Sequence, residues 1–271
     1  MHVDELLSLP TPVQEGDSQW NFNDLVIPDD WAQGRTVFGG ISAGMVYKAI
    51  SRQVHDARLL RSFTTNFVGP LALDAPFTIE VIRLREGSNV SQFTGQIIQN
   101  GKTCVFCQAC FGKARQSGIK VENTEQHEMA IPQKGKFIPQ IPKVTPRFLR
   151  HFDLSIDKGG LPFSWKKSSL YHGFMRFKQP PQQVSDAHII TLIDAWPPTL
   201  LQMMKLPAPA STVSWNIEFI HPHHEVSPSD WFAYQCKTRQ AADGYGHTEA
   251  TIWNAHGDVI AISRQTVAVF D

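Results

Sequence analysis

The stretch SFTTNFVGP at residues 62–70 recurs in outline as SWNIEFIHP at residues 214–222, about half the chain length later. Each stretch mixes polar and apolar residues as a half-buried strand does, and each ends on a turn residue followed by proline. A further turn signal follows in each half, at Asn100-Gly101 and at His256-Gly257. Self-similarity over half the chain is unlike the short period of a solenoid and predicts two fused copies of one module.

Each half is predicted to contain a first strand, a buried helix and a run of antiparallel strands. Small residues in the first helix, such as Gly44, predict that a sheet approaches it closely. In the second half, Pro197-Pro198 interrupts the helical stretch, and proline is tolerated in the first turn of a helix but not deeper. The main part of that helix is therefore predicted to start near Asp194–Pro197. The expected elements are a strand at 20–26, a helix at 41–50 and strands at 60–68, 76–86, 90–99 and 103–113; then strands at 150–156 and 170–178, a helix within 185–204 and strands at 212–220, 231–240, 246–254 and 259–270.

Residues 116–146 are polar and rich in proline, which is typical of a connector. The predicted organisation is therefore an N-terminal repeat at 1–115, a connector at 116–146 and a C-terminal repeat at 147–271. Periodicity alone supports a duplicated α+β chain with antiparallel sheets.

The charge balance argues against a nucleic-acid partner, since Lys+Arg and Asp+Glu both total 25 and a non-specific binder needs a basic face. No apolar run approaches the roughly 20 residues that span a bilayer, so we expect no membrane partner. The N-terminus is acidic and lacks a leader pattern, which predicts a cytoplasmic protein.

Two groups of residues have a superficial metal-ligand spacing. Cys104, Cys107 and Cys110 fall on a predicted strand, where Cys107 points away from the other two and convergence on one ion is difficult. His221, His223 and His224 sit at a strand end in a turn. Buried thiols and turn histidines are the favoured interpretations, and we expect no metal.

Two segments of the N-terminal half resemble the bacterial acyl-CoA thioesterase II family. These are GRTVFGG at residues 34–40 with the helix after it, and EGSN at 86–89 leading to QNGK at 99–102. The resemblance covers nearly the whole chain apart from the connector. It implies a double hot-dog fold, α+β, in which two repeats each wrap a curved antiparallel β-sheet around a buried helix. It also implies hydrolysis of acyl-CoA thioesters in fatty acid metabolism, without a cofactor. The two halves predict a homo-oligomer built through exposed sheets.

The C-terminal half supplies the sharper match to this family. The family places Asp, Thr and Gln around a hydrolytic water, at positions that match Asp194, Thr212 and Gln265. A carboxylate at a helix N-terminus is favoured in its charged form, so Asp194 would act as the base. Thr212 and Gln265 would orient the water, and the backbone amides after Gly39-Gly40 would bind the oxyanion. We expect the site to straddle the two halves. Direct attack by Asp194, through an anhydride, is the less favoured variant.

Simpler structural roles remain open for the same residues. Asp194 could be a plain N-cap, Thr212 an ordinary strand residue and Gly39-Gly40 a plain helix start. Many family members carry Asp-His where this chain has Ser214-Trp215. This departure keeps open a non-catalytic acyl-CoA-binding double hot-dog protein.

Three further readings rank lower. A hydratase usually pairs Asp with His, and no His closely follows Asp194. The stretch GISAG at 40–44 has the letters of a nucleophile elbow around Ser42, but it follows a loop. Cations at 166–167, 176 and 178 could meet CoA phosphates, although a solvated charged face is the default.

Overall fold

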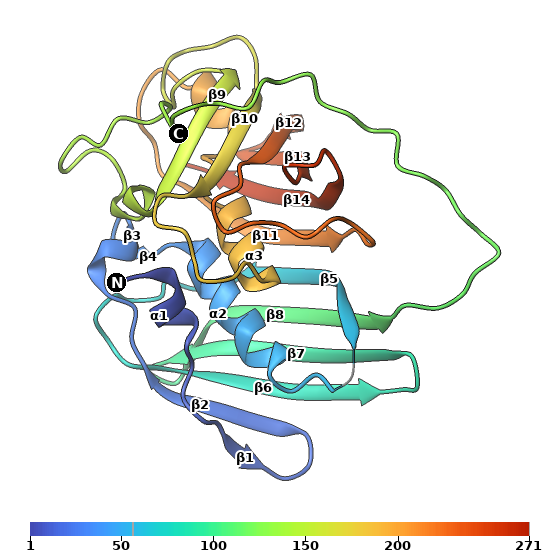
Figure 1. Ribbon diagram of the computed structural model, residues 1–271. Helices are drawn as coiled ribbons and strands as arrows, with labels where there is room; N and C mark the ends of the chain where they lie inside the picture. The colour runs from blue at the N-terminus through green and yellow to red at the C-terminus, as the bar shows by residue number, and fades with distance from the viewer. Residues whose placement is uncertain (56, 271) are drawn as a thin grey trace. The chain divides into compact units, whose positions relative to one another are not determined.

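The chain divides into two compact units in this computed structural model, which describes residues 1–55 and 57–270 (Figure 1). The first unit comprises Met1–Glu122, Pro146–Phe148 and Val184–Thr191. The second unit comprises Asn123–Thr145, Leu149–Gln183 and the chain from Leu192 onward. Among the described residues, no helix is long and apolar enough to cross a membrane.

The first unit is an antiparallel sheet with one long helix packed on it. Its strands are neighbours in the order β1-β2-β6-β7-β8-β5, and α2 packs against β6, β7 and β8 (Figure 1). Asn100 and Gly101 join β7 to β8 with φ values of 52° and 71°, as the predicted Asn-Gly turn requires. The elements are α1 (Val3–Leu7), β1 (Val13–Glu15), β2 (Gln19–Leu25), η1 (Asp29–Trp31), β3 (Ala32–Gln33), β4 (Thr36–Val37), α2 (Gly39–Ser51), β5 (Arg58–Phe67), β6 (Phe77–Glu86), β7 (Val90–Gln99) and β8 (Lys102–Lys113).

The second unit is also built on an antiparallel sheet, with strands neighbouring in the order β11-β14-β13-β12-β10-β9. The two orders match: β5, the first strand after α2, lies next to β8, and β11, the first strand after η3, lies next to β14. The short helix η3 covers β10 and β12. The remaining elements of the chain are η2 (Arg147–His151), β9 (Phe152–Lys158), β10 (Leu170–Phe177), α3 (Asp186–Ile193), η3 (Thr199–Met203), β11 (Ala210–Phe219), β12 (Phe232–Ala242), β13 (Tyr245–Trp253) and β14 (Val259–Val269).

The close approach of helix and sheet in the first unit depends on a glycine of the sheet. A Cβ on Gly95 of β7 would lie 2.6 Å from Cγ1 of Val46 on α2. Gly40 and Gly44 of α2 serve a different contact, since each faces a carbonyl of α3. The prediction that Gly44 admits a sheet is therefore corrected: it lets two helices approach.

The prediction that the main part of the second helix starts near Asp194–Pro197 is wrong, because α3 ends at Ile193. Its start is fixed earlier, where the Ser185 backbone N–H donates to Nδ1 of His188 at 3.1 Å. This bond satisfies the backbone amide that precedes the helix. Pro197 disfavours helical backbone at the residue before it, so the proline pair separates α3 from η3 rather than opening one long helix.

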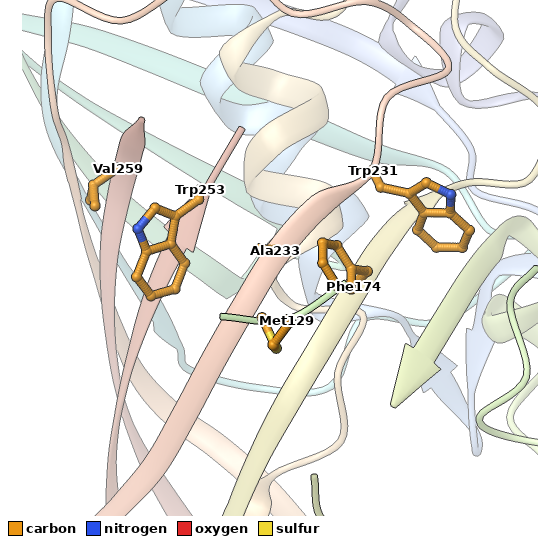
Figure 2. Close-up of a cluster of buried hydrophobic side chains, with 6 residues drawn as sticks. All are labelled: Met129, Phe174, Trp231, Ala233, Trp253 and Val259. Atoms are coloured by element: carbon orange, nitrogen blue, oxygen red, sulfur yellow. The ribbon is translucent and has the colours of Figure 1, made fainter. Parts of the chain in front are cut away.

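Part of the predicted connector belongs to the core of the second unit. Met129 is 9% exposed and packs in a cluster with two tryptophans and a phenylalanine (Figure 2). Phe137 is similarly buried. Burial of these apolar side chains stabilises the packing of the proline-rich segment on the second unit. The cluster in Figure 2 consists of Met129, Phe174, Trp231, Ala233, Trp253 and Val259.

Candidate active site

Three side chains of the second unit form a hydrogen-bonded chain. Gln265 on β14 donates from Nε2 to Oδ1 of Asp194 at 3.0 Å. Thr212 on β11 donates from Oγ1 to Oε1 of the same glutamine at 3.5 Å. The second bond is at the long limit for a hydrogen bond and is the weaker of the two. All three residues are half-buried, so solvent reaches a group whose partners are fixed.

A β-bulge brings Thr212 to the same face of the sheet as Gln265. Trp215 of β11 lies opposite Gln265, whereas Thr212 lies opposite Val267. Gln265 and Val267 are two residues apart and therefore share a face. Thr212 and Trp215 are three residues apart, and they share that face because the register shifts between Thr212 and Ser214.

The carboxylate of Asp194 accepts a hydrogen bond from a side chain and does not lie at the N-terminus of α3. Asp194 follows the C-terminal end of α3, where the helix dipole is unfavourable for a carboxylate. The amide of Gln265 donates a hydrogen bond to the Asp194 carboxylate. This corrects the electrostatic role that the sequence predicted, while Asp194 stays an acceptor.

Tyr234, an aromatic residue that the sequence did not single out, lies close to Asp194. Burial raises the pKa of the Tyr234 phenol well above its ordinary value, and the nearby charge of Asp194 adds to the rise. The ring of Tyr234 stacks on Trp196, two residues after Asp194, with centroids 5.1 Å apart. Nε1 of Trp196 is buried and has no hydrogen-bond partner among the described residues. The position of Tyr234 depends on strand register, which single-sequence patterns give poorly.

Two known domain families match separate segments of this chain. Residues 27–112 match the family described as "Acyl-CoA thioesterase N-terminal domain", and residues 126–269 match "Acyl-CoA thioesterase C-terminal domain". The chain belongs to the acyl-CoA thioesterase family. Acyl-CoA thioesterase 2 of Haemophilus influenzae is 24% identical over 255 residues, which cover 85% of this chain and 86% of the relative.

Solved structures of similar proteins show that the fold is a hot-dog fold. A hot-dog protein of unknown function from Alicyclobacillus acidocaldarius has a TM-score of 0.79 and 21% identity, covering 99% of this chain and 98% of its own. Acyl-CoA thioesterase II TesB2 of Mycobacterium marinum has a TM-score of 0.69 and 18% identity, covering 100% and 97%.

Ser214 and Trp215, where this thioesterase departs from many family members, lie in two different environments. Trp215 is 1% exposed and donates from Nε1 to Oγ of Ser263 at 2.8 Å, so it is a core residue beside Gln265. Ser214 lies opposite Thr266, on the other face of the sheet. This chain therefore has a buried indole ring next to Gln265, and neither Ser214 nor Trp215 supplies an ionisable group.

Gly39 and Gly40, the predicted oxyanion residues, begin α2 in the first unit. The first amides of a helix have no partner within it, and the N-cap Phe38 makes no side-chain cap in the described part of the chain. A Cβ on Gly40 would lie 2.7 Å from the carbonyl oxygen of Thr191, so packing already accounts for this glycine. Their oxyanion role stays a prediction.

Most of the remaining nucleophile and metal candidates of the sequence have structural partners. Ser42 is 2% exposed and donates to the carbonyl of Gly39 at 2.7 Å. His224 contacts the carboxylate of Asp258 at 2.8 Å. Burial raises the pKa of the Cys107 thiol to about 12, which holds it in the neutral form.

Proposed function

We propose that Asp194, Thr212 and Gln265 hold and activate the water that hydrolyses the acyl-CoA thioester. Membership of the thioesterase family gives the reaction, and the hydrogen-bonded chain of these three side chains is the observation that supports this assignment. A single half-buried carboxylate held by an amide donor is an arrangement suited to general-base catalysis.

The proposed reaction needs one base and one water. Asp194 accepts a proton from water while the water oxygen attacks the thioester carbonyl carbon. The tetrahedral intermediate collapses with cleavage of the carbon–sulfur bond, and the proton passes to the CoA sulfur. The products are the free carboxylic acid and CoA. Gln265 bonds Oδ1 of Asp194 and so fixes the plane of the carboxylate, while its second N–H remains to hold the water.

Gly39 and Gly40 are our candidates for the donors that stabilise the oxyanion. Preorganised backbone amides are worth several kcal/mol to a developing oxyanion, on the order of 3 kcal/mol for one donor. Their place at the first turn of α2 supports this assignment. No cofactor or metal enters this mechanism.

A single turnover in ¹⁸O-labelled water tests the proposal. Direct attack by water places one ¹⁸O in the released acid and none in the peptide that contains Asp194. Attack by the carboxylate, followed by hydrolysis of the anhydride at the aspartyl carbon, places the label in that peptide and leaves the first acid unlabelled. Label in the Asp194 peptide would contradict the water mechanism.

We further propose that the two halves, 1–115 and 147–271, are copies of one hot-dog module joined by a connector. The two units have matching strand orders, which supports this proposal. A homo-oligomer acting on fatty acyl groups in the cytoplasm completes the proposal. Light scattering after size exclusion tests the oligomer, and a monomer mass would contradict it.

A further inference from the structure

A pocket of about 460 Å³ lies in the second unit, between the 123–145 segment and the start of β9. One wall is the stretch that follows Gly135, and the opposite wall comes from η2 and β9. A Cβ on Gly135 would lie 2.8 Å from Cβ of Asp153, so the absence of a side chain holds the segment against the strand. The pocket volume is in the range of small-molecule sites.

Three cations line this pocket, although the chain as a whole has no net charge. Lys136, Arg150 and Lys178 are exposed, and none of them forms an ion pair among the described residues. The carboxylate in the lining, Asp153, is bound to Arg176 at 3.1 Å. The three cationic groups are therefore available to an anionic ligand.

We propose that this cationic pocket binds the phosphate groups of the CoA nucleotide. Several cations around one concave surface suit a ligand with more than one phosphate, since each phosphate oxygen accepts a charge-assisted bond. The apolar side chains of Ile138 and Pro139 also line the pocket, are accessible to solvent and give surface for a purine. The proposal rests on the acyl-CoA hydrolysis assigned above and adds where its carrier is held.

Aromatic packing connects the cationic pocket with the candidate active site. Phe137 lines the pocket, and its ring centroid lies 5.3 Å from that of Trp196. Trp196 is two residues from Asp194. Both sites therefore belong to the second unit, and the packed rings of Phe137 and Trp196 lie between them. A carrier anchored by its phosphates would extend its thioester arm from this side.

Titration with adenosine 3′,5′-bisphosphate tests the pocket without any thioester chemistry. We compare the wild-type chain with the triple variant Lys136→Ala, Arg150→Ala, Lys178→Ala. Lys237→Ala is the matched control, since Lys237 is an exposed lysine of the same unit outside the pocket. We expect the triple variant to bind at least 10-fold more weakly and the control to stay within twofold. Added salt should weaken the wild-type affinity.

Kinetics with two thioesters give a second readout. For acyl-CoA, KM should rise at least 10-fold in the triple variant with kcat unchanged. For the matching acyl-N-acetylcysteamine, which lacks the nucleotide, both constants should equal those of the wild type. Equal bisphosphate binding by wild type and triple variant would overturn the pocket. A wild type that hydrolyses neither thioester would overturn the proposed function, and the titration would still decide the pocket.

Discussion

Replacing Gln265 by methionine removes both bonds of the hydrogen-bonded chain while keeping side-chain length. The bond from Nε2 to Asp194 is 3.0 Å long and charge-assisted, and such bonds contribute about 1.5–3 kcal/mol. At about 1.4 kcal/mol per decade, kcat should fall about 10- to 150-fold. Thr212→Val removes only the 3.5 Å bond, so its cost should stay below about fivefold.

The assay is release of free CoA followed with a thiol reagent, with the fold checked by circular dichroism. Gln235→Met is the matched control, since Gln235 is a half-buried glutamine of β12 in the same unit. Its kcat should equal that of the wild type. A folded Gln265→Met variant with kcat within twofold of the wild type would refute the role of this glutamine. A larger loss for Thr212→Val than for Gln265→Met would refute the ranking by distance.

Three further predictions concern the stability and reactivity of the chain. Gly95→Ala should lower the free energy of unfolding by about 1–3 kcal/mol, because its Cβ would overlap Val46. Gly118→Ala, with open space around it, should leave that free energy unchanged. Urea titration of the two variants measures both values. The Cys107 thiol, whose pKa burial raises to about 12, should resist alkylation at pH 8 in the folded chain while half-exposed Cys110 reacts; equal labelling by peptide mapping would contradict this. Burial lowers the pKa of His188 below its ordinary value, so stability should be full above pH ~6.5 and fall as the pH drops through the folded pKa. His188→Gln should flatten that slope, and an unchanged slope would count against it.

The sequence predicts most strands because their alternation and turn residues are local signals. The strand predicted at 90–99 has the observed bounds, and those beside it differ by at most two residues. The short elements α1 and β1 were not anticipated, since so few residues give no periodicity. The second helix was misplaced because proline marks both a first turn and a helix end, and packing decides between them.

The candidate site could be predicted in its residues and not in its geometry. Family resemblance led to Asp194, Thr212 and Gln265, which the structure places in one hydrogen-bonded chain. The bulge after Thr212 has no local signature, and strict alternation would have put Thr212 and Trp215 on opposite faces. Tyr234 was missed for the same reason, because its proximity to Asp194 depends on how distant strands pair.

The reaction of Asp194→Asn tests the central claim most directly. Asparagine keeps an oxygen that accepts from Gln265, so the fold should persist, but it cannot accept a proton from water. Asp243→Asn is the matched control, since Asp243 lies in the turn between β12 and β13 at a φ of 54°, which asparagine tolerates. We predict that Asp194→Asn lowers kcat for CoA release by about 10²- to 10⁴-fold, as loss of a general base does, with the control unchanged. A folded Asp194→Asn variant that releases CoA at the wild-type rate would contradict the account.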